Sequence, residues 1–279
     1  MFQYAAGLAM ALRHGAELRF DLDWFDAFQL HQGLELPRVF GLELPLATAI
    51  NKRRVLGLLS EPRLRHLVSR RSLRFLRPSR FAIEPHFHFW PQFTHLPDDV
   101  YLDGYWQSER YFSSSAQQIR EAFRITSPLD ASNAALAQQI DATTSVSVHV
   151  RRGDFARNPE VSRVHGVDLR EYYWKAIEAI GRRLNKPHYF IFSDEPEWVR
   201  GHLDIAAPWT VVDHNSGVNS YRDMQLMSLC RHHVIANSTF SWWGAWLNPR
   251  PDKIVVAPCQ WFANDTPTDD LIPATWIRL

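Results

Sequence analysis

SVSVHVRRGD, residues 145–154, begins as an alternating apolar run and ends in a charged turn. The β-branched residues Val146, Val148 and Val150 predict a buried strand. Two arginines follow directly, and the carboxyl end of a strand in an open α/β sheet is where ligands bind. Each guanidinium can donate two parallel hydrogen bonds to anionic oxygens, so Arg151 and Arg152 suit a diphosphate. The alternative is a solvated charge cluster at a strand end.

From residue 128 onwards, strand patterns alternate regularly with helix patterns. We expect five strands, at 145–151, 188–194, 209–213, 232–237 and 253–258. This alternation predicts a parallel sheet wrapped by helices on both faces. The fold class is therefore α/β, and residues 128–279 form a Rossmann-like half.

Residues 1–127 form a second, less regular half. MFQYAAGLAMALRH (1–14) predicts a helix that stops at Gly15, and AELRFDL (16–22) predicts a strand. A doubly wound unit normally starts with a strand and a glycine-bearing turn before its first helix. We therefore expect the start of this half, with its opening strand, to be missing.

Composition places the chain among ordinary globular proteins. It has 279 residues, 46% hydrophobic and 22% charged, enough for one large domain or two of ordinary size. Cys230 and Cys259 give neither a disulfide framework nor a CxxC metal spacing, which fits a reducing compartment. No signal peptide precedes the first helix, and no apolar run approaches the ~18 residues of a spanning helix. These features predict a cytoplasmic protein.

The segment 52–80 is strongly basic. It carries ten Lys and Arg against one acid, Glu61, which is +9 locally, so the remainder of the +1 chain carries −8. Leucines, valines and Phe75 are interleaved with the charges. Such a segment is typical of a contact with an anionic membrane surface or a phosphate polymer, and here the expected site is the inner face of the cytoplasmic membrane. The alternative is a solvated helical face.

Polar residues follow four of the predicted strands, and in a parallel sheet these strand ends share one edge. Beside the two arginines, the edge would carry Ser193-Asp194-Glu195, Asp213-His214-Asn215 and Asn237-Ser238-Thr239. Carboxylates there can accept from ribose hydroxyls or a purine edge, and backbone N–H groups at the helix start near Ser238 attract anions. Together they predict a nucleoside-diphosphate pocket.

Other nucleotide and metal sites are not indicated. No GxG and no GxxxxGK[ST] occurs, and no DxD pair is flanked as a metal-dependent sugar-nucleotide site needs. His86 and His88 alternate on an extended segment, but no third ligand of suitable spacing is near, so aromatic packing is the better interpretation. Because arginines can neutralise a departing diphosphate without a metal, we expect neither metal nor cofactor.

Five segments are distinctive enough to suggest a family: HVRRGD (149–154), FIFSDEPEW (190–198), LMSLCRHHVIANSTFSWWGAWLN (226–248), GYWQSERYF (104–112) and MFQYAAGLA (1–9). In order along the chain, they resemble the bacterial α-1,2-fucosyltransferases of glycosyltransferase family 11. The resemblance implies a GT-B-like fold of two Rossmann-like halves. It also implies metal-independent, inverting transfer of L-fucose from GDP-β-L-fucose to the 2-hydroxyl of a terminal galactose in a surface glycan.

The resemblance also implies roles for site residues. Arg151 and Arg152 would hold the β-phosphate, Asp154 would orient them, and His149 and Asp194 would face the guanosine. The remaining predicted contacts to the donor are Ser193, Asn237, Ser238, Thr239 and Ser241. Simpler interpretations stay open: His149 as a satisfied strand histidine, and Asp194 and Ser238 as helix caps. For Trp242, Trp243 and Trp246 a place in the core is the better interpretation.

The general base is not identified by the sequence, and the candidates are Asp103, Glu195 and His214. Two features depart from the family pattern. The strand and GGLGNQ turn expected before MFQYA are absent, and Glu195 stands where the family usually has aspartate.

Three hypotheses follow for function. The first is a fucosyltransferase acting on a galactose-terminated oligosaccharide or lipid-linked glycan, and the second is a non-catalytic GDP-sugar-binding remnant. The third, nucleic-acid binding through 52–80, is the weakest, because the remaining −8 opposes a polyanion and no nucleic-acid fold is visible.

Overall fold

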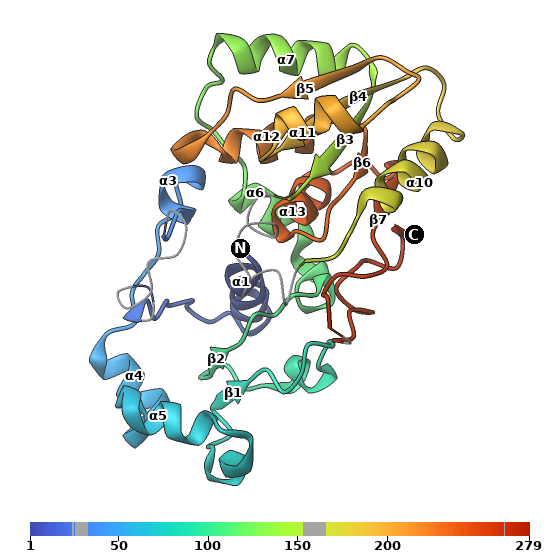
Figure 1. Cartoon of the computed structure of the whole chain (residues 1–279). Helices are drawn as coiled ribbons and strands as arrows, with labels where there is room; N and C mark the ends of the chain where they lie inside the picture. The colour runs from blue at the N-terminus through green and yellow to red at the C-terminus, as the bar shows by residue number, and fades with distance from the viewer. Residues whose placement is uncertain (24, 26–32, 153–165, 265) are drawn as a thin grey trace. The chain divides into compact units, whose positions relative to one another are not determined.

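The computed structural model of the chain describes residues 1–23, 25, 33–152, 166–264 and 266–279 (Figure 1). The chain divides into two compact units. Unit 1 comprises Met1–Arg124 and Asp269–Pro273, and unit 2 comprises Ile125–Thr268 and Ala274–Leu279. Both units combine helices with parallel strands, so the predicted α/β class with parallel sheets is confirmed.

Unit 2 is built on a six-stranded sheet in which every pair of neighbours is parallel. Its strands, in spatial order, are β5 (Trp209–Val212), β4 (Pro187–Ser193), β3 (Thr144–Val150), β6 (His232–Val234), β7 (Val255–Ala257) and β8 (Ile277–Arg278). The five predicted strands are all present. The sequence analysis missed β8, because two residues carry no period-2 pattern.

Helices cover both faces of this sheet, as predicted. Alternate residues of β4 point to opposite faces: Tyr189 and Ile191 pack with α10 (Arg170–Gly181) and α11 (Pro196–His202), whereas Phe190 and Phe192 pack on the other side. That other side is covered by two helices, α7 (Ala131–Asp141) and α12 (Tyr221–Leu229). Coverage of both faces explains why most residues of β3, β4 and β7 are buried. The remaining elements of unit 2 are η6 (Gly217–Asn219) and α13 (Thr239–Leu247).

Unit 1 opens with α1 (Phe2–His14), which ends as predicted at Gly15 in the left-handed region, with φ 61°. The strand predicted at 16–22 is wrong, because only an isolated parallel bridge joins Phe20 to Leu46. The amide of Phe20 donates to the carbonyl of Pro45 at 2.8 Å, and the amide of Ala47 donates to the carbonyl of Phe20 at 2.8 Å. Pro45 has no N–H to give, so the ladder does not extend on that side.

The sheet of unit 1 is a single parallel pair, β1 (Phe81–Ile83) with β2 (Tyr101–Asp103). It is smaller than the Rossmann-like half expected from the resemblance. Its other elements, predominantly helical, are α3 (Leu36–Phe40), α4 (Ala49–Leu56), η1 (Gly57–Ser60), α5 (Pro62–Ser69), η2 (Arg71–Leu76), η3 (Pro91–His95), η4 (Glu109–Tyr111), η5 (Ser113–Ser115) and α6 (Ala116–Ala122). Within the described residues, no helix has the length and apolar character needed to cross a bilayer.

Candidate functional site

The strand order of unit 2 reverses between β3 and β6. From β3 the chain adds β4 and β5 on one side, and β6 then returns to pair with β3 on its other side. Ligands of open α/β sheets bind at such a switch point, outside the carboxyl ends of the strands. Arg151 and Arg152 follow β3, and Asn237 and Ser238 follow β6, so the topology brings these four residues to the two sides of the switch point.

Each of the two arginines lies beside a carboxylate from the turn after β4. Nη1 of Arg151 is 3.3 Å from Oδ2 of Asp194, and Nε of Arg152 is 3.6 Å from Oε2 of Glu195. The amide of Arg152 also donates to Oδ1 of Asp194 at 3.1 Å. The arginine side chains remain 28% and 30% exposed, and a guanidinium offers five N–H donors in a fixed fork. A diphosphate bound here would share the cations with Asp194 and Glu195.

Trp198 is a partner of the arginines that the sequence analysis missed. Its indole lies under the guanidinium of Arg152, whose Cζ is 4.0 Å from the ring centroid. Trp198 lies in the first turn of α11, directly after the Ser-Asp-Glu turn. One signal in the sequence could have indicated this contact. Trp198 is an aromatic residue in the first turn of the helix that follows the charged end of β4. Tyr173 was missed for lack of any such signal: its hydroxyl accepts from the amide of Arg151 at 3.4 Å.

His149 is the penultimate residue of β3 and is 6% exposed. Its ring centroid is 5.8 Å from that of Phe240, at 45°. Burial, and then the charge of Arg151, lowers the pKa of His149 to about 3, so the ring is neutral at physiological pH. Among the described residues its Nδ1 has no hydrogen-bond partner. The interpretation as a fully satisfied strand histidine is therefore not supported.

The start of α13 presents hydroxyl groups and helix N–H groups. Ser238 is the N-cap, but its side chain makes no capping bond; its carbonyl accepts from the amide of Trp242 at 3.0 Å. Ser241 is buried and its Oγ donates to the same carbonyl at 3.2 Å. Asn237 is buried and its Nδ2 donates to the carbonyl of Trp261 at 3.0 Å. Ser238 and the half-buried Thr239 thus hold the accessible hydroxyls at this helix start.

The tryptophans of α13 belong to the core. Trp242, Trp243 and Trp246 are 0%, 2% and 3% exposed, and their rings contact one another. A role as a sugar platform is therefore excluded for them, and the core interpretation is confirmed.

The end of β5 carries a polar network. Nδ2 of Asn215 donates to Oδ1 of Asn133 at 2.9 Å and to Oδ1 of Asp223 at 2.8 Å. Nε2 of His214 is 3.0 Å from the same Oδ1 of Asn133. Burial raises the pKa of Asp223 to about 7, and the hydrogen bond from Asn215 opposes that rise. His214, a candidate base, is therefore already engaged with an internal amide.

The other predicted residues are placed as follows. Ser193 ends β4, and its Oγ accepts from the amide of Glu195 at 3.0 Å, so it shapes the turn that carries the carboxylates. Asp103 is exposed at the end of β2 in unit 1. Asp154 lies outside the described residues.

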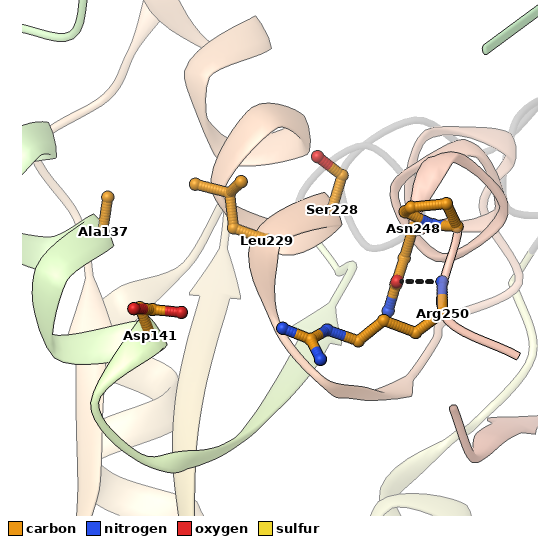
Figure 2. A pocket seen from close by; sticks show the side chains of 7 residues that line it. Ala137, Asp141, Ser228, Leu229, Asn248 and Arg250 are labelled. Atoms are coloured by element: carbon orange, nitrogen blue, oxygen red, sulfur yellow. Dashed lines mark hydrogen bonds between the residues drawn. The ribbon is translucent and has the colours of Figure 1, made fainter. Parts of the chain in front are cut away.

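Unit 2 contains a cavity of about 410 Å³ (Figure 2), and neither Arg151 nor Arg152 lines it. It is lined by Ala137, Asp141, Ser228, Leu229, Asn248, Pro249 and Arg250. These residues precede β3, β6 and β7, so the cavity lies at the amino edge of the sheet. Because ligands of parallel sheets bind at the carboxyl edge, we do not assign the nucleotide to this cavity.

No three His, Cys, Asp or Glu side chains gather as metal ligands within the described parts of the chain. The rings of His86 and His88 meet edge to face with centroids 5.6 Å apart, and Nδ1 of His86 lies 3.2 Å from the carbonyl of His88. The pair thus packs as the sequence analysis favoured.

Comparison with known proteins identifies the family. The family model "Glycosyl transferase family 11" matches residues 79–279. The α-1,2-colitosyltransferase of Escherichia coli is 33% identical in an alignment that covers 100% of this chain and 94% of that protein. The chain belongs to glycosyl transferase family 11. The galactoside 2-α-L-fucosyltransferase SEC1 of Bos taurus is 29% identical over 58% of this chain and 46% of its own length.

The resemblance predicted from the motifs is therefore confirmed at the level of the family 11 glycosyltransferases. A solved structure, NodZ α-1,6-fucosyltransferase soaked with GDP-fucose, aligns with 91% of this chain and 89% of its own, at 15% identity and a TM-score of 0.45. The family 11 match includes all the predicted site residues, from His149 to Ser241.

Proposed function

We propose that this family 11 glycosyltransferase moves L-fucose from GDP-β-L-fucose to the 2-hydroxyl of a terminal galactose in a surface glycan, with inversion and without a metal. One observation carries the proposal: two adjacent arginines follow the central strand at the topological switch point. The name of the SEC1 relative supports the fucosyl donor and the galactoside acceptor. A galactose-terminated oligosaccharide or a lipid-linked glycan is the expected acceptor.

In this reaction the acceptor oxygen bonds to the anomeric carbon while the bond from that carbon to the β-phosphate oxygen breaks. The acceptor hydroxyl gives up its proton, and GDP leaves with the electron pair of the broken bond. Arg151 and Arg152 stabilise the negative charge that grows on the diphosphate, because their fork geometry matches phosphate oxygens. Asp194 and Glu195 keep the forks oriented before the donor binds.

The proposal assigns two further contacts. The neutral ring of His149 offers a hydrogen-bonding nitrogen to the guanosine, and Ser238 and Thr239 bind the diphosphate through hydroxyls and helix N–H groups. Of the candidate bases, Glu195 lies beside Arg152. His214 instead shares a hydrogen bond with the side chain of Asn133.

A second candidate donor is favoured by a specific observation. The relative that aligns with the whole chain is named a colitosyltransferase. Colitose is L-fucose without the 3-hydroxyl, so a pocket for one sugar differs from a pocket for the other by a single hydrogen-bonding position. A site built to bind that hydroxyl would reject the deoxy sugar strongly, whereas an apolar pocket would discriminate weakly against the hydroxyl.

The test is a donor competition with purified protein. GDP-fucose and GDP-colitose are each incubated with lactose and with lacto-N-biose, and the products are analysed by mass spectrometry and linkage analysis. We expect transfer of fucose to the 2-hydroxyl of galactose, with a kcat/KM for GDP-fucose at least tenfold above that for GDP-colitose. Preference for GDP-colitose would overturn the fucosyl donor. GDP binding by calorimetry without transfer from either donor would identify a non-catalytic remnant.

A further inference from the structure

The segment from α4 to η2 in unit 1 exposes large apolar side chains. Leu58 is 81% exposed, Phe75 is 76% exposed and Leu67 is 43% exposed. Single exposed apolar residues need no explanation. Here they belong to one segment that also carries exposed arginines. α4 and α5 lie next to each other in Figure 1, at one end of unit 1.

One side of these helices packs against the rest of unit 1. Leu56 and Val68 are buried with Phe81 in a local core. Lys52 and Arg65 both bind Asp21, with Nζ 3.2 Å from Oδ1 and Nη1 3.0 Å from Oδ2. Arg54 and Arg80 likewise pair with Asp99. Arg77 donates to the carbonyls of Val68 and Ser69, so at least five of the ten cations of this segment serve contacts within unit 1.

Other arginines of the segment point outward. Along α5, Arg63 and Leu67 are four residues apart and share a face roughly opposite Arg65 and Val68, because each residue advances the helix by about 100°. Arg53, Arg63 and Arg70 are exposed, and none of them pairs with a carboxylate among the described residues. We define the basic-apolar surface as Arg53, Leu58, Arg63, Leu67, Arg70 and Phe75.

We propose that this basic-apolar surface docks unit 1 on an anionic lipid bilayer. Phe75, Leu58 and Leu67 enter the boundary between headgroups and acyl chains, and the arginines bind lipid phosphates around them. Charge complementarity selects this occupant. In a two-fold contact between copies, the same patch would face itself and set arginine against arginine.

Docking at this surface accounts for the pairing of charge with exposed apolar area, and it does not depend on which sugar the enzyme transfers. The cytoplasmic leaflet is anionic, so a protein in the cytoplasm would dock on its inner surface. An acceptor carried on a lipid would then be within reach without a spanning helix.

The test uses the full chain and vesicles of phosphatidylcholine with or without 30% phosphatidylglycerol. We expect co-sedimentation with the anionic vesicles and at least tenfold weaker binding to the neutral ones. The triple variant Arg53→Gln, Arg63→Gln, Arg70→Gln should weaken binding to anionic vesicles by about 100-fold, since each cation near an anionic surface contributes about a fivefold factor. The pair Leu58→Ser, Phe75→Ser should weaken it by at least tenfold.

A matched control is the triple variant Arg124→Gln, Arg182→Gln, Arg183→Gln, which removes as many exposed arginines from other elements. It should bind anionic vesicles within about threefold of the parent chain, and circular dichroism melts should show that all variants fold. Equal binding to both vesicle types, or equal losses in the two triple variants, would overturn the proposal. A dimer in sedimentation velocity that becomes monomeric in Leu58→Ser, Phe75→Ser would overturn it in favour of self-association.

Discussion

The guanidinium of Arg152 lies over the indole of Trp198, with Cζ 4.0 Å from the ring centroid. The other neighbour of the indole is His202, one turn further along α11, with ring centroids 4.6 Å apart and planes at 8°. A residue of α11, the helix after β4, thus contacts and positions Arg152, which follows β3. A cation that stabilises a leaving group is most effective when it is already in place as the charge develops.

Replacement of Trp198 should therefore reduce transfer by mispositioning Arg152. We expect Trp198→Leu to lower kcat/KM by about 3–30-fold, which corresponds to the usual range of a cation–π contact, and Trp198→Phe to lower it less. Steady-state kinetics with GDP-fucose and lactose provides the measurement. A positioning role requires that the loss shrink in an Arg152→Lys background. Trp174→Leu, at an exposed tryptophan of α10, is the control and should be neutral.

The sheet of unit 2 could be predicted because the residue pattern of each strand depends on which of its faces are buried. Val146, Val148 and Val150 alternate with polar residues on β3, whereas residues 189–192 of β4 and all of β7 are apolar and buried, as coverage of both faces favours. The same local logic placed the end of α1 at Gly15. It failed at 16–22, because a strand also needs a partner, and the partner segment contains Pro45.

The sequence predicted which edge of the sheet carries the candidate site, but it did not predict which side chains contact each other there. The rule that parallel strands share a carboxyl edge placed Arg151 and Asp194 together, and their ion pair bears this out. Which carboxylate meets which guanidinium depends on turn geometry and rotamers, so the ion pair between Asp194 and Arg151 was not predicted. Trp198 was missed for the same reason, since its contact spans two strands.

Lysine substitutions separate charge from geometry at the two arginines. Arg151→Lys and Arg152→Lys keep the cation but lose the fork that binds two phosphate oxygens. We expect each to lower kcat by about 100-fold, the usual effect of removing one donor to a developing anion, with a smaller effect on GDP affinity. Calorimetry with GDP and initial-rate assays give both quantities. The control is Arg170→Lys, whose arginine pairs with Asp168 on the surface; rates equal to the control in both variants would rule out the assigned role.

Asp223 makes stability depend on pH. Its pKa is about 7 in the folded chain because of burial, against about 3.9 for an unfolded aspartate. Between these values the folded state holds a proton that the unfolded state has lost, so this group's contribution to stability falls as pH rises from about 4 to about 7. Asp223→Asn keeps an acceptor for Asn215 and removes the buried charge.

We therefore expect Asp223→Asn to be more stable than the parent chain at pH 8 by about 1–3 kcal/mol, with a smaller difference at pH 5. Urea unfolding at the two pH values measures it. The exposed Asp204→Asn serves as the control. A gap between Asp223→Asn and the parent that is larger at pH 5 than at pH 8 would have the wrong sign for a buried carboxylate.

His233 ties β3 and β6 to the turn after α13. Its Nδ1 is 2.8 Å from Oγ of Ser147, and its Nε2 is 2.9 Å from Nδ2 of Asn248. Burial lowers the pKa of His233 well below its usual value, so the ring is neutral and has one donor and one acceptor nitrogen. Since Nδ2 of Asn248 can only donate, Nε2 is the acceptor and Nδ1–H donates to Ser147.

Asn248→Ala should consequently destabilise unit 2. The change leaves Nε2 of His233 without its donor, and it also removes the bond from Asn248 Nδ2 to the carbonyl of Cys230, at 2.8 Å. Two buried acceptors without partners cost about 2–4 kcal/mol together, because each retains its full desolvation penalty. The free energy of unfolding in urea at pH 7 measures the loss, and the exposed Asn185→Ala is the matched control. A loss no larger than that of the control would mean that the neutral-histidine network does not stabilise the junction of β3 and β6.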